Sequence, residues 1–212
     1  YLVTPELHQW LSIYKSVSEQ ASRRGSHELE ISKPVANRAI APTGSIAILS
    51  STTSGIEPLF AVAYKRRYLK NKKWHYQYVV DSSAQSVSDR YGVDPDDMES
   101  ALDLAHNYEK RIKFQADVQD YVDMSISSTI NLPAYGTEGN NQDLVKPFAK
   151  TLADYAHRLR GFTCYPDGAR GGQPLSSVPY KEAADKLGEE IEEAIETHDI
   201  CAITGKGGTC GV

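Results

Sequence analysis

The chain has 212 residues, 40% of them hydrophobic, and a formal net charge of −5 at neutral pH. That length allows one large domain or two small ones. Its acidity argues against binding to duplex nucleic acid, and no apolar run approaches the roughly 20 residues that a membrane helix requires. The chain opens at Tyr1 rather than Met, which suggests a processed product or a fragment.

The first predicted element is a helix that begins at Pro5. Thr4 supplies a capping hydroxyl, and Glu6 places a negative charge near the positive end of the helix. We expect Gly25 to end this helix or the turn after it. Apolar residues at helical spacing predict a face that packs in the core, made of Leu7, Trp10, Leu11, Tyr14 and Val17.

Residues 35–41 predict a short strand that leads into a small-residue turn. Residues 46–49 are apolar and fit either a helical turn or a buried strand. Strands are predicted over residues 59–64 and 74–80, with a basic turn between them. The basic residues of that turn are Lys65, Arg66, Arg67, Lys70, Lys72 and Lys73. Such a run is typical of a solvated turn, and the alternative is a patch for a nucleotide or a partner.

The middle of the chain alternates between helices and strands. Helices are predicted over residues 94–105, 112–122 and 143–160, and strands over residues 129–132 and 162–165. This alternation indicates an α/β architecture.

The composition changes after residue 170, where glycines mark a linker. Residues 180–196 are acidic and predict a helix, and the glycine-rich residues 204–212 predict a mobile tail. The sequence therefore divides into a main part, residues 1–170, and a linker with helix and tail, residues 171–212.

The turn at Ala41-Pro42-Thr43-Gly44-Ser45-Ile46 is the first candidate site. Small residues after a strand allow backbone N–H groups to approach an anion, and Thr43 and Ser45 add hydroxyl donors. An ordinary helix cap is the alternative. The segment is not a Walker loop, because no Gly-Lys-Ser/Thr follows it.

The cysteines give the second candidate. Cys201 and Cys210 lie near the end of the chain with glycines between them, and a dithiol on a mobile arm can exchange disulfides with a buried pair and then with an external reductant. Two unrelated exposed thiols are the alternative. Cys164 falls in a predicted strand and is expected to be a buried apolar residue. Three cysteines fit a reducing cytoplasm, and the histidines show no metal-ligand spacing, so no metal site is predicted.

Several segments, taken in order, resemble the large chains of ribonucleotide reductases across about residues 35–170. The matching segments are Ala41–Ile46, Ser54–Pro58, Phe60–Arg67, Gln119–Asp123, Ser127–Pro133 and Arg160–Arg170. The Pro-Thr-Gly-Ser turn with Ala63-Tyr64-Lys65-Arg66-Arg67 is most similar to class II enzymes, which use adenosylcobalamin. Class I enzymes, with a separate metal subunit that supplies the radical, are the alternative.

The resemblance implies that the chain is the C-terminal part of a ten-stranded α/β barrel with a flexible tail. It implies thiyl-radical reduction of a ribonucleotide whose phosphates are held by Pro42, Thr43, Gly44, Ser45 and Ile46. The family's radical cysteine, flanked by Asn and Glu, has no counterpart here, so no catalytic residue is identified in this portion.

The expected partners are therefore the N-terminal portion of the reductase, without which the chain is inactive, and a ribonucleotide substrate. A thioredoxin-like reductant is expected to act through Cys201 and Cys210. A non-catalytic accessory chain is the remaining alternative, with the basic stretch and the acidic helix as docking surfaces.

Overall fold

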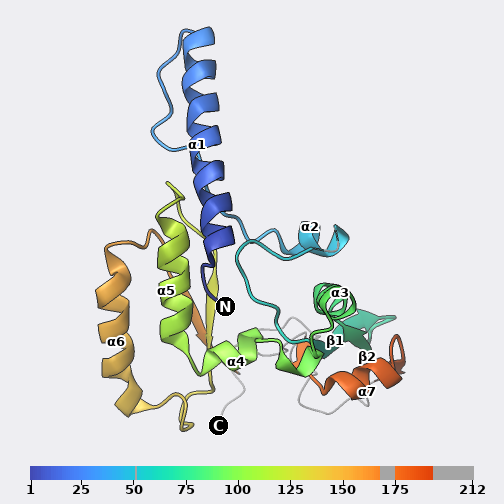
Figure 1. The fold of residues 1–212 in the computed structure, drawn as a ribbon. Coiled ribbons are helices and arrows are strands. Elements are labelled where there is room, and N and C mark those ends of the chain that lie inside the picture. Colours follow the sequence, from blue (N-terminus) through green and yellow to red (C-terminus); the bar gives the residue numbers. More distant parts are fainter. Residues whose placement is uncertain (51, 168–174, 193–212) are drawn as a thin grey trace. The chain divides into compact units, whose positions relative to one another are not determined.

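The structure is a computed structural model (Figure 1). It describes residues 1–50, 52–167 and 175–192. The chain divides into two compact units. The first unit comprises residues 1–62 and 81–171, and the second comprises residues 63–80 and 172–212.

The first unit holds most of the helices and one parallel pair of strands. Its elements are α1 (Pro5–Glu28), α2 (Gly44–Leu49), α3 (Ser82–Tyr91), the short 3-10 helix η1 (Pro95–Asp97), α4 (Ala101–Ala105), α5 (Tyr108–Gln119), β3 (Thr129–Leu132), α6 (Gln142–Ala156) and β4 (Thr163–Pro166). Strands β3 and β4 run parallel, with Ile130 opposite Cys164. This mixed arrangement confirms the predicted α/β class.

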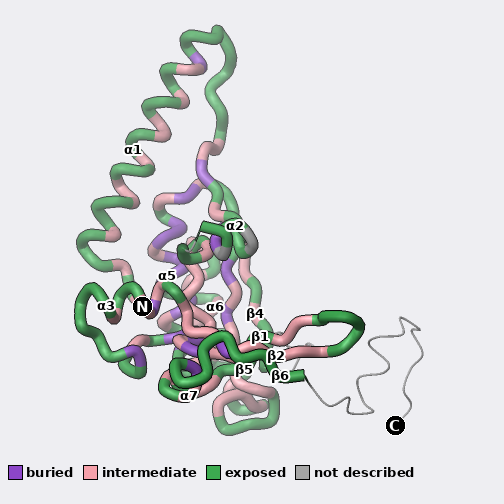
Figure 2. Tube along the Cα trace, turned by 90° about the vertical axis from the view of Figure 1, so that its right-hand side faces the viewer, coloured by how far each residue is buried: buried purple, intermediate pink, exposed green. Residues whose placement is uncertain are grey.

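The core of this unit is built around α5, which carries many of its buried positions (Figure 2). Phe114 and Val118 of α5 pack with Val122 and Ile126, which follow the helix. Leu7 and Leu11 of α1 pack against this cluster, together with Tyr1, Val3, Ile40 and Ile56. Burial of this apolar area stabilises the packing of α5 against α1.

Helix α1 begins as predicted, since the Thr4 hydroxyl accepts a hydrogen bond from the Leu7 amide. Two expectations about it were wrong. The helix continues through Gly25 to Glu28, because an isolated glycine weakens a helix without ending it. The apolar stripe is only partly core: Trp10 and Val17 are 62% and 58% exposed, and the last turns extend past α5 (Figures 1 and 2).

A buried arginine ties α1 to the segment that follows α5. The Arg38 side chain is 1% exposed and donates to the carbonyl of Tyr121 at 2.8 Å, the hydroxyl of Ser18 at 2.8 Å and the carboxylate of Asp123 at 2.7 Å. It also donates to Lys15 O of α1 at 3.2 Å. Because a buried guanidinium must satisfy its donors, these contacts fix where residues 38–40 run.

The helices in the middle of the chain differ from prediction. The expected helix at 94–105 is interrupted, because Met98 is extended and Ser100 starts α4 with a capping box to Asp103. Helix α5 ends at Gln119 rather than 122, and α6 starts after Asn141 and stops at Ala156. Helix α3 was not predicted. The expected strand at 35–41 makes only a parallel bridge from Ile40 to Ile126.

The second unit is a four-stranded antiparallel sheet. Its elements are β1 (Ala63–Lys70), β2 (Lys73–Val80), β5 (Leu175–Ser177), α7 (Tyr180–Asp185) and β6 (Glu190–Glu192), with strand order β5-β1-β2-β6. Helix α7 packs on β1 and β2 through Ala63, Tyr78 and Ala183. The buried core of the described sheet is small, because α7 spans only six residues.

Three predictions for this unit were wrong. The first strand starts at Ala63 instead of 59, so most of the basic residues lie in β1, and the turn itself is Asn71 and Lys72, both with positive φ. The acidic helix predicted over 180–196 ends at Asp185, since Gly188 adopts a left-handed backbone (φ 79°) and reverses the chain into β6. Strand β5 was not predicted.

The described residues contain the parallel pair β3–β4 and no closed barrel. None of the described helices combines the length and the apolar content that crossing a bilayer requires.

Candidate functional site

The candidate loop follows the carboxyl end of a parallel segment. Residues 38–40 run beside residues 124–127, with the Met124 amide donating to the Arg38 carbonyl and the Ser127 amide to the Ile40 carbonyl, each at 2.9 Å. The same stretch continues into β3, which pairs in parallel with β4. In open α/β sheets, ligands bind at the carboxyl ends of parallel strands. The loop at residues 41–46 begins at such an end.

The loop is open to solvent. Ala41, Pro42, Thr43 and Gly44 are exposed, and Ile46 is 66% exposed. The Thr43 carbonyl accepts from the Ala47 amide at 2.8 Å and closes the first turn of α2. The amides of residues 44–46 therefore sit in that first turn, where a helix offers them no acceptor. Backbone donors in a solvent-exposed turn can bind an anionic oxygen.

Thr43 has a left-handed backbone, with φ of 50°. A non-glycine residue in that region is uncommon and persists where its surroundings hold it. The predicted residues 42–46 are thus brought together in one exposed turn, although the Ser45 side chain lies outside what the structure describes.

The chain returns from α2 and packs directly behind this turn. The Ser54 hydroxyl donates to the Pro42 carbonyl. Gly55 has φ of 54°, and a Cβ there would meet the Ala41 carbonyl oxygen at 3.0 Å and Ile40 Cγ2 at 3.3 Å. Only glycine fits this close approach without a shift of the neighbouring backbone. The segment 54–57 matched the family in sequence, but its spatial role was not predicted.

The basic stretch is paired with acids of its own unit. Lys70 contacts Glu190 at 2.8 Å, Lys73 forms an ion pair with Glu192, and Lys65 lies 3.7 Å from Glu182. The hydrogen bond from Lys70 holds the pKa of the Glu190 carboxyl below its usual value. These contacts join the two sequence regions that were expected to be separate docking surfaces.

The remaining candidates take structural positions. Cys164 is a half-buried free cysteine in β4, and burial raises the pKa of its thiol. Asp94, the first residue of the helix predicted over residues 94–105, caps η1 by accepting from the Asp96 amide at 3.0 Å. Over the described parts of the chain, no group of three His, Cys, Asp or Glu side chains is placed to hold a metal ion. Cys201 and Cys210 lie outside the described residues.

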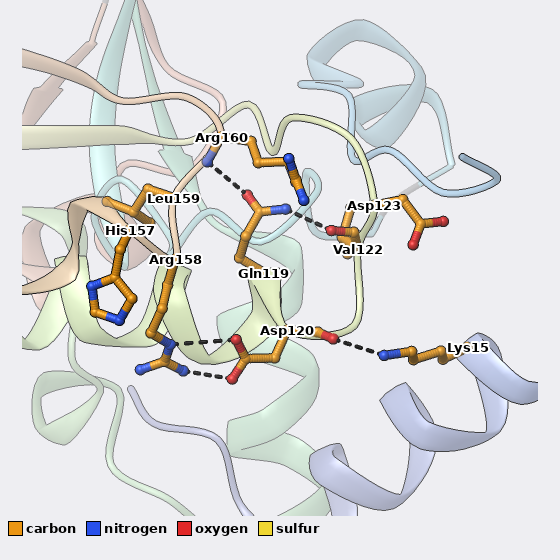
Figure 3. A pocket seen from close by; sticks show the side chains of 9 residues that line it. All are labelled: Lys15, Gln119, Asp120, Val122, Asp123, His157, Arg158, Leu159 and Arg160. Carbon is orange, nitrogen blue, oxygen red and sulfur yellow. Dashed lines mark hydrogen bonds and ion pairs between the residues drawn. The ribbon is translucent and has the colours of Figure 1, made fainter. Parts of the chain in front are cut away.

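A polar cavity of about 380 Å³ lies elsewhere in the first unit (Figure 3). Its lining consists of Lys15, Gln119, Asp120, Val122, Asp123, His157, Arg158, Leu159 and Arg160. Arg158 already binds Asp117 at 2.9 Å and Asp120 at 2.7 Å, and Lys15 donates to the Asp120 carbonyl at 3.1 Å. None of the lining residues belongs to the loop at 41–46, so this cavity is separate from the candidate loop.

Comparison with known proteins points to one family. The family model described as the barrel domain of ribonucleotide reductase matches residues 35–165 of the sequence, more than half of the chain. A vitamin B12-dependent ribonucleoside-diphosphate reductase of Mycobacterium tuberculosis (strain CDC 1551 / Oshkosh) is 29% identical over 161 residues, which cover 68% of this chain and 22% of that protein. A putative adenosylcobalamin-dependent ribonucleoside-triphosphate reductase of Mycobacterium phage D29 is 28% identical over 203 residues, covering 79% of this chain and 28% of that protein.

A crystal structure of a B12-dependent class II ribonucleotide reductase has the same fold. It matches with a TM-score of 0.62 at 12% identity, over 84% of this chain and 26% of that chain. The chain therefore spans between 22% and 28% of the length of these relatives.

Proposed function

This chain belongs to the ribonucleotide reductase barrel-domain family, and we propose from that premise that its loop at residues 41–46 holds the phosphates of a ribonucleotide substrate. The loop acts within a reductase of the adenosylcobalamin-dependent class, as the names of the relatives suggest. Because the chain spans only part of those relatives, the reaction requires the rest of the barrel.

One observation carries the proposal. The exposed turn at 41–44 follows the carboxyl end of a parallel segment, and the first amides of α2 have no acceptor within that helix. These amides and the Thr43 hydroxyl supply neutral donors for phosphate oxygens, so the loop binds an anion although the chain as a whole is acidic. The role of this chain is to place the ribose where the radical chemistry of the other portion reaches it.

The cavity of Figure 3 does not fit adenosylcobalamin. The cavity of Figure 3, about 380 Å³, is at the small end of the range for drug-sized ligands, and the cofactor is larger than such a ligand. When bound, the cofactor supplies the radical-generating chemistry. We assign its binding to the rest of the reductase.

The partner that completes the site is the N-terminal portion of the barrel. Strands β3 and β4 form a two-stranded parallel sheet in the described structure, and parallel strands occur almost only in larger sheets buried on both faces. Residues 1–170 are accordingly proposed to contribute later strands and helices to a ten-stranded barrel, and residues 171–212 to carry the tail.

The tail cysteines are proposed as a shuttle that passes electrons from a thioredoxin-like reductant to the active site. The support is the position of Cys201 and Cys210 near the end of the chain. Changing both to serine should abolish turnover with thioredoxin and leave turnover with a small dithiol intact. Full activity with thioredoxin would remove the shuttle from the proposal.

The phosphate loop is tested by nucleotide affinity in the reassembled reductase. Thr43→Ala removes one donor to a charged group, worth about 1.5–3 kcal/mol, so the Kd for ribonucleotide should rise by roughly tenfold or more. The matched control is Thr53→Ala, the same change at an exposed residue of the return segment. Affinity for the phosphate-free ribonucleoside should not change in either variant. Equal nucleotide affinity in both variants and the parent would refute the loop.

A further inference from the structure

Arg111 is a buried charge that the proposed site does not yet use. It lies on α5, its side chain is 3% exposed, and it donates to Glu57 Oε2, to the Ser128 hydroxyl and to the Thr129 carbonyl, each at 2.9 Å. The Tyr1 ring lies beneath its guanidinium at 4.8 Å. Apolar side chains of similar volume often stabilise such a position as well as a buried ion pair does. Stability alone therefore does not account for an arginine here.

Glu57 connects this charge to the strand beside the loop. One carboxylate oxygen accepts from Arg111, and the other accepts from the Thr129 amide at 2.6 Å. The carboxylate thus accepts the backbone N–H of Thr129, the first residue of β3. The Tyr1 hydroxyl donates to the Ile56 carbonyl, which holds the same short segment from a second side.

The segment held by Glu57 supports the loop. Two residues before Glu57, the Gly55 backbone approaches the Ala41 carbonyl so closely that a Cβ would lie 3.0 Å from it. Ser54 donates to the Pro42 carbonyl. The loop residues 41–44 are exposed and bury no side chains of their own. Their position therefore depends on contacts from behind, and those contacts lead through Glu57 to Arg111.

We infer that Arg111 is a positioning residue for substrate phosphate, acting through Glu57 on the segment that backs the loop at residues 41–46. This inference rests on the proposed function, because it assigns a support to the same loop. Loss of the guanidinium frees residues 54–57, and the loop amides then lose their common orientation. Nucleotide affinity then decreases, while the rate at which bound nucleotide reacts changes little.

The test uses the reassembled reductase with ribonucleoside diphosphate and triphosphate as separate substrates. Arg111→Met should raise the KM of the accepted nucleotide by about tenfold with kcat within about twofold, as loss of uniform binding predicts. Glu57→Gln is the milder second variant, in case Arg111→Met does not fold, and should raise KM in the same direction. Arg111→Lys keeps the charge and should recover part of the affinity.

A control at another ion pair of α5 separates positioning of the loop from general weakening of this helix. Arg158→Ala removes ion pairs to Asp117 and Asp120 of the helix and the residue after it. It should lower the melting temperature without raising KM. If the KM of Arg111→Met and Glu57→Gln rises no more than that of Arg158→Ala, the inference is overturned.

The Thr43→Ala variant keeps the two ideas distinguishable. If Thr43→Ala raises KM and the Arg111 and Glu57 variants do not, the phosphate loop is supported and the positioning role of Arg111 is refuted. If Thr43→Ala leaves KM unchanged, both the proposed function of the loop and the positioning role of Arg111 are refuted.

Discussion

Replacing Arg38 with alanine removes a buried side chain that joins α1 to the segment after α5. Its guanidinium donates to Ser18 and Lys15 of α1 and, across the interface, to Tyr121 and Asp123. Truncating one partner of a buried ion pair costs about 3–5 kcal/mol. We expect the lower end, because the Asp123 carboxylate is 29% exposed and remains hydrated when its partner is lost.

Hydrogen exchange measures this loss where it occurs. If Arg38→Ala lowers the free energy of local opening by about 3 kcal/mol, the α1 amides should exchange roughly 150-fold faster than in the parent. The α7 amides, in the second unit, should be unaffected.

Arg38 also donates to the Glu19 carboxylate at 3.2 Å. Arg23→Ala is the matched control, because Arg23 contacts the same carboxylate at 3.7 Å from a side chain that is 66% exposed. Exposed pairs of this kind contribute about 0.2–1 kcal/mol, so α1 should exchange less than roughly sixfold faster. Equal effects of Arg38→Ala and Arg23→Ala would refute the reasoning that burial makes the Arg38 contacts strong.

Two further predictions concern local structure. Gly55→Ala should destabilise the protein by about 1–3 kcal/mol, since it places a Cβ against the Ala41 carbonyl at positive φ. Gly25→Ala, where the added Cβ enters open space within α1, should stabilise the protein by about 0.5–1 kcal/mol. Urea unfolding that gave both changes the same sign would contradict this account of the two glycines. The hydroxyl and amide of Ser100 hold the pKa of Asp103 below its usual value. The ionised cap therefore contributes stability above the unfolded pKa of about 3.9, and the advantage over Asp103→Asn should be lost as the pH falls through the folded pKa; a difference that stayed constant with pH would count against it.

Local signals in the sequence were sufficient to predict those elements that do not depend on distant contacts. The Thr4 cap, the start of α1 at Pro5 and the strand at 129–132 appear in the structure as expected. Helix α3 was missed, because its ten residues carry few large apolar side chains, although Asp81 and Gly92 mark its two ends. The capping signal at Ser100 likewise identified α4 only in retrospect.

The strand predicted over residues 74–80 is confirmed as β2, whereas the first strand of the second unit was misplaced because tertiary pairing decides where it lies. The apolar residues at 59–62 favoured an early strand, while the charged β1 is stabilised by its pairing with β2 and by acids such as Glu182 and Glu190. Those acids lie more than a hundred residues away in sequence. No periodicity in the chain shows such a pairing.

The candidate site shows the same limit. The loop at 41–46 was predicted from its small residues and its resemblance to the family. Its support was not, because Arg111 and Glu57 are 54 residues apart in sequence. The only local signal was Gly55, which a turn at positive φ requires.

Amide exchange of the loop during nucleotide binding tests the central claim most directly. In the reassembled reductase, saturating ribonucleotide should slow exchange of the amides at residues 44–46, and the phosphate-free ribonucleoside should not. The α3 amides serve as the internal reference and should exchange equally in every condition. Exchange of residues 44–46 that is unchanged by bound ribonucleotide would contradict the claim that these amides hold its phosphates.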